Sequence, residues 1–279
     1  MRIAIIPNMT REDAASVTAD VIKELDTLGI EYMLSNELFG VIRGKSAVCC
    51  DEEQMLHDCD TVIAIGGDGS IISAAHKALR FDKPVLGVNA GRLAFLAGLE
   101  RHELSLLRSL IDGEYSVDKR MMLCMQIIRD GQVLCEDLCL NDAVISRTGA
   151  AKLTGVAVKA DGRKFCEYLG DGIIVATPTG STAYSLSAGG PVVDPSIESI
   201  LLTPVCSHSL TARPMIFGDS TTLELSCTTS GETSVTCDGR EPFIIPDNAV
   251  IRIFKAEKYA YFIRIKSDTF ADVLMNKLK

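Results

Sequence analysis

The chain has 279 residues, 47% of them hydrophobic, which is enough to bury the core of one large domain or two smaller ones. A formal net charge of -9 argues against a general nucleic-acid binder, because such proteins carry a basic surface. No apolar run reaches the ~18 residues of a membrane span, and no charged-then-apolar leader precedes the first strand. We therefore expect a cytoplasmic protein that binds neither nucleic acid nor membrane. The ten cysteines include no Cys-x-x-Cys pair and are interpreted as reduced thiols.

The N-terminal part alternates between apolar, strand-like runs and residues at helical spacing. Strands are predicted over 2–7, 30–34, 61–66 and 84–88. Helices are predicted over about 10–28, 51–58, 70–80 and 100–111, and a loop over 35–50. Because strand and helix alternate, we expect an α/β domain, a Rossmann-like parallel sheet with helices on both faces.

The pattern changes near Asp112-Gly113 to short strands and hairpin turns at Asp130-Gly131 and Asp161-Gly162. Strands are predicted over 121–128, 133–140, 156–160, 164–168, 222–227, 233–237, 249–254 and 259–266. Strands at this spacing indicate a β-sandwich-like domain. The tail, 268–278, returns to helical spacing, with Phe270, Val273, Leu274 and Leu278 on one face, and should pack back on the first domain, since this apolar face must be buried. The predicted domains are 1–113 plus 267–279, and 114–266.

The stretch from Thr61 to Arg80 contains a β-branched apolar run, then Gly66-Gly-Asp-Gly69, then small and apolar residues at helical spacing. Strand, glycine loop and helix can hold phosphate, because glycines let the backbone approach a ligand and the first helical turn offers unpaired N–H groups. An ordinary Asp-Gly turn is the alternative interpretation of the tetrapeptide. A carboxylate next to phosphate is repelled, so Asp68 needs a reason, such as proton transfer or metal binding.

Two further stretches are rich in polar side chains. Asn141-Asp142 lies between apolar runs and is interpreted either as an Asx turn or as a clamp on the two hydroxyls of a sugar diol. From Asp171 to Pro191, a short apolar strand enters a turn crowded with Thr, Ser and Gly, followed by Tyr184. Small hydroxyls and exposed backbone can read a purine edge or a phosphate, and a tyrosine can stack on a flat ring.

Together these stretches resemble the NAD kinase family over nearly the whole chain. The motifs are, in order, Gly66-Gly-Asp-Gly69, Asn141-Asp142, and Asp171-Gly with Thr177-Pro-Thr-Gly-Ser-Thr-Ala-Tyr184 and Ser187-Ala-Gly-Gly-Pro191. Diacylglycerol-type kinases and phosphofructokinases share the glycine loop but not the third motif. The resemblance implies phosphorylation of the adenosine-ribose 2′-hydroxyl of NAD by ATP or polyphosphate, giving NADP.

The resemblance also implies roles for residues of this sequence. Asp68 would be the catalytic carboxylate, with Gly69 beside the substrate. Asn141 and Asp142 would hold adenosine-side hydroxyls, and Asp171 the nicotinamide-side ribose. The other residues implied to contact the dinucleotide are Lys152, Thr182, Ala183, Tyr184, Ser187 and Arg240.

The same resemblance implies ATP and NAD as substrates, a divalent metal such as Mg²⁺ held mainly through the phosphates, and a homo-oligomer, either tetramer or dimer. Two other function classes stay open. One is a catalytically silent dinucleotide-binding regulator on the same fold, and the other is a lipid or sugar kinase sharing only the glycine loop. An intact Asp68 favours an enzyme over a regulator.

Overall fold

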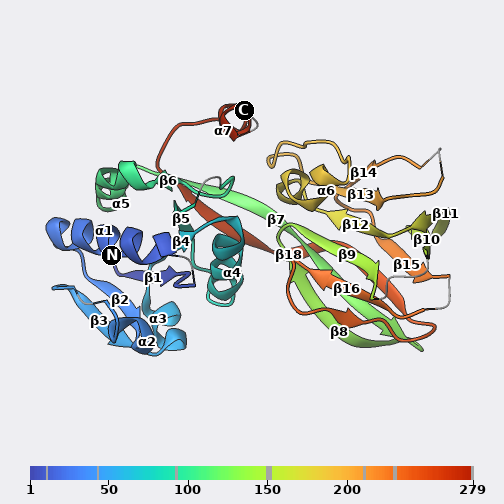
Figure 1. Ribbon diagram of the computed structural model, residues 1–279, viewed down its shortest axis with the longest axis horizontal. Coiled ribbons are helices and arrows are strands. Elements are labelled where there is room, and N and C mark those ends of the chain that lie inside the picture. The colour runs from blue at the N-terminus through green and yellow to red at the C-terminus, as the bar shows by residue number, and fades with distance from the viewer. Residues whose placement is uncertain are drawn as a thin grey trace. The chain divides into compact units, whose positions relative to one another are not determined.

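The computed structural model describes residues 1–10, 12–42, 44–91, 94–148, 153–209, 212–228 and 231–277. The chain forms two compact units (Figure 1). Unit 1 comprises 1–119 and 260–279, and unit 2 comprises 120–259. The chain passes between them within two long strands, β7 (Ser116–Arg129) and β18 (Val250–Arg264), whereas the sequence places the divisions at the ends of elements. A strand continues wherever its backbone is paired, so no local pattern marks the residue at which it leaves one unit.

Unit 1 is built on a parallel sheet, as predicted. Its strands run in the order β5-β4-β1-β2-β3, with β6 and the end of β18 also paired to β5. The bounds are β1 Ile3–Pro7, β2 Tyr32–Ser35, β3 Ala47–Cys50, β4 Thr61–Gly66, β5 Val85–Asn89 and β6 Leu99–Glu100. Each of these pairs is parallel, which requires the crossover connections that the helices supply.

Helices cover both faces of this sheet. They are α1 Glu12–Leu28, α2 Asn36–Phe39, α3 Glu52–Asp58, α4 Asp68–Leu79, the 3-10 helix η1 Arg101–Leu107 and α5 Arg108–Asp112. Ile63 and Ile65 of β4 share a buried core with Val17 of α1 and Leu107 of η1. The remaining residues of β4 are buried as well, so the opposite face of the sheet is also covered. Successive strand residues point to opposite faces, and the uninterrupted apolar run in β4 is therefore explained.

Three local predictions in these elements are wrong. Residues 35–50 are not a loop, because α2 and β3 form there. Ser35 accepts a hydrogen bond from the Leu38 N–H at 3.3 Å and begins α2, and β3 adds a parallel edge strand next to β2. The predicted helix at 100–111 starts as a 3-10 helix. The two strands predicted at 249–254 and 259–266 are one strand, β18.

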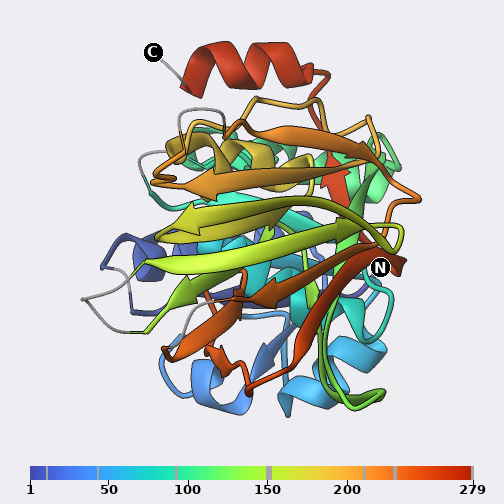
Figure 2. The same cartoon turned by 90° about the vertical axis from the view of Figure 1, so that its right-hand side faces the viewer.

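Unit 2 contains two packed sheets, which confirms the predicted sandwich-like arrangement (Figure 2). One sheet has the order β14-β13-β12-β9-β16-β17, and the other joins β11-β10-β15 to β18, β7 and β8. Leu123, Val158 and Ile251 from the second sheet share a buried core with Ile145 and Val175 from the first. The bounds are β8 Gln132–Cys139, β9 Asp142–Arg147, β10 Thr154–Ala160, β11 Arg163–Gly170, β12 Gly172–Ala176, η2 Thr179–Thr182, α6 Tyr184–Ser187, β13 Ser199–Val205, β14 Met215–Gly218, β15 Leu223–Cys227, β16 Thr233–Cys237 and β17 Phe243–Ile244.

The predicted Asp-Gly hairpins are present. Asp130 and Gly131 have φ of 52° and 78°, and Asp161 and Gly162 have 50° and 74°. Two successive positive φ values match the twist of the flanking strands, and glycine adopts the second without steric cost. Asp238-Gly239 has the same geometry between β16 and β17, with φ of 50° and 67°.

The C-terminal helix α7, Phe270–Lys277, belongs to unit 1. Lys277 Nζ lies 3.1 Å from Glu100 Oε1 and ties the end of α7 to unit 1. Phe270, Val273 and Leu274 form the predicted apolar face but are only half-buried, and the predicted fourth member, Leu278, lies outside the described residues. Within the described chain, no helix is long and apolar enough to cross a membrane.

Candidate functional site

The glycine loop joins β4 to α4 and fixes Asp68 as the first residue of the helix. Gly66 has φ of +156°, a conformation that favours glycine, and Gly67 is the N-cap residue. The Asp68 carboxylate accepts hydrogen bonds from the N–H of Phe95 at 2.9 Å and of Leu96 at 2.8 Å. Gly69 is exposed next to it. The loop therefore presents a half-buried carboxylate whose orientation is set by two backbone donors.

The Asn141-Asp142 turn connects β8 to β9 in unit 2 and is organised by Asp238. The Asp238 carboxylate accepts hydrogen bonds from three successive backbone N–H groups, those of Leu140 at 2.7 Å, Asn141 at 2.7 Å and Asp142 at 3.0 Å. In return, the Asp238 N–H donates to the carbonyl of Asp142 at 2.9 Å. The structure thus ties the turn to the β16–β17 hairpin.

Asp142 is an unusual carboxylate in this site. It is 6% exposed, and among the described residues no hydrogen bond or ion pair reaches its carboxyl group. Burial, together with the nearby negative charge of Asp238, raises the pKa of Asp142 to about 7. A group with this pKa changes protonation near neutral pH, so it can act both as a donor and as an acceptor toward a hydroxyl.

The loop after β12 lies directly against this turn. The Thr177 N–H donates to the carbonyl of Asn141 at 2.8 Å, and Thr177 Oγ1 donates to the carbonyl of Leu140 at 2.5 Å. A Cβ on Gly180 would lie 2.1 Å from the carbonyl oxygen of Asn141, so only glycine fits at this approach. The second and third predicted motifs are therefore brought together by backbone contacts.

The hydroxyl-rich stretch divides into two groups by burial. Four hydroxyl side chains are buried: Thr177, Thr179, Ser181 and Ser185. Ser181 Oγ accepts from the Val193 N–H at 3.0 Å, and Ser185 Oγ lies 2.8 Å from Thr203 Oγ1. The residues predicted to bind the dinucleotide are at least partly exposed, namely Thr182, Ala183, Tyr184 and Ser187. The first group holds the loop in shape, and the second is available to a ligand.

Asp171 lies at the other end of the β9–β12 strand pair. Asp142 pairs with Ala176, whereas Gly172 pairs with Ser146. At ~3.3 Å per strand residue, Asp171 is therefore roughly 17 Å from Asp142 along the strands. Its carboxylate forms an ion pair with the Arg147 guanidinium at 2.7 Å.

Arg240 does not extend freely from its hairpin. Its guanidinium donates to the carbonyl of Leu138 at 2.7 Å and to that of Cys237 at 3.2 Å, and it forms an ion pair with Asp137 at 2.8 Å. Arg240, which was predicted to contact the ligand, is thus bound to residues of β8 in the structure. Lys152, the other basic residue predicted to bind, lies outside the described residues.

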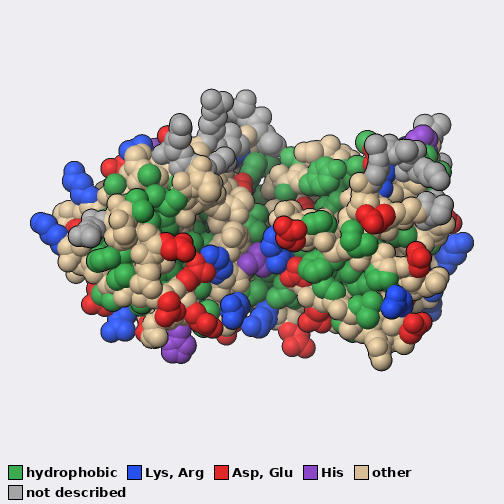
Figure 3. Space-filling view, turned by 60° about the horizontal axis from the view of Figure 1, so that its bottom comes forward, with side chains coloured by type: hydrophobic (Ala, Val, Ile, Leu, Met, Phe, Trp, Pro, Cys, Tyr) green, Lys and Arg blue, Asp and Glu red, His purple; other side chains and the backbone are tan. Residues whose placement is uncertain are grey.

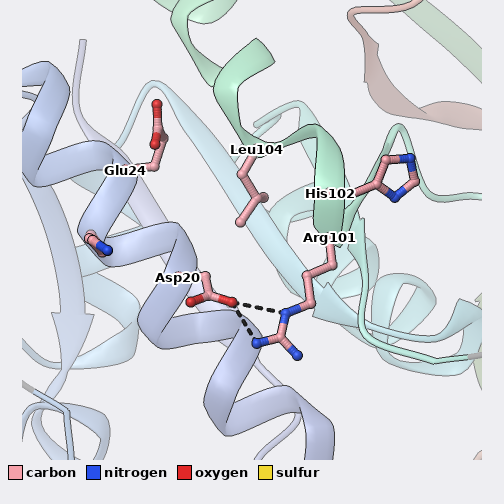
Figure 4. A pocket seen from close by; sticks show the side chains of 6 residues that line it. Asp20, Glu24, Arg101, His102 and Leu104 are labelled. Atoms are coloured by element: carbon pink, nitrogen blue, oxygen red, sulfur yellow. Dashed lines mark hydrogen bonds and ion pairs between the residues drawn. The ribbon is translucent and has the colours of Figure 1, made fainter.

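A hollow with mixed charges lies elsewhere in unit 1, between α1 and η1. It has a volume of about 620 Å³ and is lined by Asp20, Lys23, Glu24, Arg101, His102 and Leu104 (Figure 4). Arg101 Nη2 is paired with Asp20 at 2.7 Å, so these charges satisfy one another rather than a ligand. Acidic and basic side chains are likewise interspersed on the face drawn in Figure 3.

Comparison with known proteins identifies the family to which the chain belongs. Sequence profiles of the ATP-NAD kinase N-terminal and C-terminal domains match residues 3–115 and 140–265. The NAD kinase of Symbiobacterium thermophilum is 36% identical over 99% of this chain and 98% of its own length. The NAD kinase of Caldanaerobacter subterraneus is 35% identical over the same shares.

The chain belongs to the NAD kinase family. A solved NAD kinase from Archaeoglobus fulgidus, in complex with ATP, has a TM-score of 0.74 and 25% identity over 100% of this chain and 98% of that one. A yeast NADH kinase complexed with NADH has a TM-score of 0.87 at 24% identity, covering 99% and 85%, and shows that the fold is shared. The predicted family is confirmed by these matches.

Within this NAD kinase fold, two residues that touch the predicted site were missed by sequence reasoning as parts of it. They are Asp238 and Arg147. The Asp238-Gly239 dipeptide does carry a turn signal, but the residues that Asp238 holds are almost a hundred positions earlier in the chain. Arg147 pairs with Asp171 only because β9 and β12 are adjacent.

Proposed function

We propose that the protein phosphorylates the adenosine-ribose 2′-hydroxyl of NAD, with ATP or polyphosphate as the donor, to give NADP. Asp68 carries the proposal, because a carboxylate fixed by the Phe95 and Leu96 N–H groups stands at the N-terminus of a helix that follows a glycine loop. The full-length similarity to proteins named NAD kinase supports NAD as the acceptor.

Asp68 would act as the proton acceptor. A sugar hydroxyl is a weak nucleophile and loses its proton as it attacks the γ-phosphate of ATP. Phosphoryl transfer otherwise needs mainly positioning and neutralisation of charge. Two backbone donors hold the Asp68 carboxylate in one orientation, which leaves its remaining lone pairs for the hydroxyl proton.

Unit 2 would supply most of the contacts to NAD. Asn141 and Asp142 would hold adenosine-side hydroxyls, and Asp171 would hold the nicotinamide-side ribose at the other end of the strand pair. Tyr184 is 47% exposed and can stack on a flat ring. Thr182, Ala183 and Ser187 offer hydroxyls and backbone groups beside it. Lys152 and Arg240 are proposed as further contacts, for which Arg240 would have to leave Asp137.

A divalent cation, with Mg²⁺ as the first candidate, would neutralise the phosphates of the bound substrates. No group of three or more potential ligands gathers among the described His, Cys, Asp and Glu residues. Mg²⁺ typically keeps several waters and binds through substrate phosphates with one or two carboxylates, so the described residues fit a phosphate-held ion. Asp68, in the glycine loop, is our candidate for a protein carboxylate in that role.

We further propose a cytoplasmic homo-oligomer, a dimer or tetramer. The β-rich unit 2 has several strand edges, such as that of β14, which need pairing or cover. Light scattering at micromolar concentration tests this proposal. A monomer mass near the 30.1 kDa of the chain would contradict it.

The deciding experiment incubates the purified protein with NAD, magnesium and either ATP or polyphosphate, and then assays NADP enzymatically. We expect NADP with at least one donor. Binding of NAD without any NADP would instead indicate a silent dinucleotide-binding protein. An Asp68→Asn preparation serves as the negative control, since it keeps the shape of the loop.

A further inference from the structure

We propose that Asp238 is a positioning residue for NAD: by holding the backbone of Leu140, Asn141 and Asp142, it presents the side chains of the Asn141-Asp142 turn to the ribose. The inference rests on the proposed function, because it assigns these two side chains to the substrate. It adds a residue that touches no substrate itself and acts through the turn.

The hydrogen bonds that support this role run in both directions between Asp238 and the turn. Asp238 Oδ2 accepts from Leu140, and Oδ1 accepts from both Asn141 and Asp142, at 2.7 to 3.0 Å. The Asp238 N–H donates back to the Asp142 carbonyl at 2.9 Å. Hydrogen bonds to a charged acceptor are shorter and stronger than neutral ones, and a three-amide set fixes the orientation of the whole turn. These bonds engage only the backbone of the turn, so the partly exposed Asn141 side chain and the buried Asp142 carboxyl group keep their hydrogen-bonding capacity for the ribose.

The hairpin that carries Asp238 is itself held in place. Asp238 and Gly239 both have positive φ, which sets the tight turn after β16. Two residues later, the Arg240 guanidinium donates to the carbonyls of Leu138 and Cys237 and pairs with Asp137. Asp238 therefore binds N–H groups of the turn after β8, while Arg240 of the same hairpin binds a carbonyl and a carboxylate of β8 itself. The turn thus has little freedom to shift.

The same arrangement places two carboxyl groups side by side. The charged side chains on the elements around Asp142 are Asp238, Arg240 and Glu241 from the hairpin and Glu136 and Asp137 from β8, and Ala176 of β12 opposite it carries no charge. Because Arg240 is engaged by Asp137, the charge that acts on Asp142 is that of Asp238. The protonation of Asp142, and with it the affinity for a hydroxyl, therefore depends on Asp238.

This dependence separates a positioning role from a merely structural one. Replacing Asp238 by Asn removes the negative charge and one of the two acceptor oxygens. The lost acceptor weakens the hold on the turn and the binding of NAD. The lost charge lowers the pKa of Asp142, so the pH midpoint of kcat/KM for NAD moves to lower pH. Asp238→Glu keeps the charge but displaces it, and should weaken NAD binding with the midpoint near that of the wild type.

The matched control is Asp161→Asn. Asp161 also occupies the first position of an Asp-Gly hairpin in unit 2, with φ of 50°, and accepts one backbone hydrogen bond, from Thr222 at 2.9 Å. It lies outside the proposed binding residues. Folding of all three variants is checked by circular dichroism and thermal unfolding before kinetics.

We expect Asp238→Asn to raise KM for NAD by at least about 10-fold, which is the effect of losing one hydrogen bond to a charged group. We expect kcat to change much less. We expect Asp161→Asn to change neither. The proposal is overturned if both variants behave alike, if Asp238→Asn lowers kcat at unchanged KM, or if its pH midpoint equals that of the wild type. Should Asp238→Asn fail to fold, the KM of Asp238→Glu decides, and a wild-type value overturns the proposal.

Hydrogen exchange of the ligand-free protein gives a readout that needs no activity. The N–H groups of residues 140–142 should exchange faster in Asp238→Asn than in Asp161→Asn, because they lose their acceptor. Unchanged exchange would overturn the clamp even in an active enzyme. Faster exchange in a protein that makes no NADP would keep the clamp and refute only the proposed function.

Discussion

Units 1 and 2 each set an aspartate at the first residue of an element that follows a turn, Asp68 in α4 and Asp142 in β9, but they surround the two carboxylates differently. The half-buried Asp68 accepts two backbone hydrogen bonds, from Phe95 and Leu96. Asp142 is almost fully buried, its carboxyl group receives no hydrogen bond from the described residues, and it lies near a second carboxylate, Asp238. Backbone donors stabilise a negative charge, whereas burial and a like charge oppose it.

The difference shows how one fold can give two different tasks to two residues of the same type, aspartate. A carboxylate with fixed orientation suits proton acceptance, because geometry limits that step. A carboxyl group that titrates near neutral pH suits binding of a hydroxyl, since it can accept or donate. Substitutions of Asp68 in unit 1 and of Asp142 in unit 2 should therefore have different phenotypes. The following substitutions test that difference, from the largest expected effect to the smallest.

Asp68→Asn should destroy turnover while leaving NAD binding nearly intact. Loss of a general base slows a reaction by ~10²–10⁴-fold, or roughly 3–5 kcal/mol of barrier. The amide keeps the shape of the loop, so the dissociation constant for NAD, measured by calorimetry, should move much less. Recovery of most of the rate at high magnesium would show that Asp68 holds metal instead.

Asp142→Asn should stabilise the folded protein at neutral and alkaline pH. With a pKa of about 7 in the folded state and the ordinary value near 4 in the unfolded state, wild-type Asp142 holds a proton that unfolding releases between these values. Wild-type stability therefore falls as pH rises through this window, by about 4 kcal/mol, because each of the three pKa units corresponds to about 1.4 kcal/mol. Asparagine does not ionise, so the stability gap measured by urea unfolding should be small at pH 4 and open fully above pH 7. An equal gap at every pH would contradict the raised pKa.

Tyr184→Ala should weaken NAD binding without destabilising the fold. Tyr184 is 47% exposed, so removal of its ring leaves no large cavity. Stacking of an aromatic side chain on a base contributes about 1–3 kcal/mol, which corresponds to roughly 5- to 150-fold in KM for NAD. Tyr184→Phe is the control and should bind nearly as well as the wild type. A wild-type KM in the alanine variant would exclude stacking.

Arg101→Ala should have the smallest effect. Arg101 and Asp20 are paired at 2.7 Å, but their side chains are 51% and 44% exposed, and such surface pairs contribute about 0–1 kcal/mol. We expect a shift of at most a few degrees in Tm and unchanged kinetics. A large loss of activity would mean that the hollow between α1 and η1 takes part in function.

Much of the fold follows from local sequence. The uninterrupted apolar run of β4 indicates a strand buried on both faces, and the helical spacing of α1 indicates a helix buried on one face. The turns at Asp130-Gly131 and Asp161-Gly162 need positive φ values that few residue pairs adopt. Residues 35–50 were mispredicted because β3 is a short edge strand whose pairing with β2, rather than its own pattern, makes it a strand. The charged residues within 255–258 likewise hid the continuity of β18.

What the sequence by itself determined is the chemistry available, namely the glycine loop with Asp68, the Asn141-Asp142 pair and the hydroxyl-rich third motif. These motifs are contiguous, so their residue types and spacing are visible in one dimension. Only the tertiary structure decided which hydroxyls are buried, that Arg240 is engaged by Asp137, and that Asp238 holds the turn and raises the pKa of Asp142. The reason is physical: hydrogen bonds, burial and charge act through space, and the partners of Asp238 meet it only because two strands of one sheet bring them together.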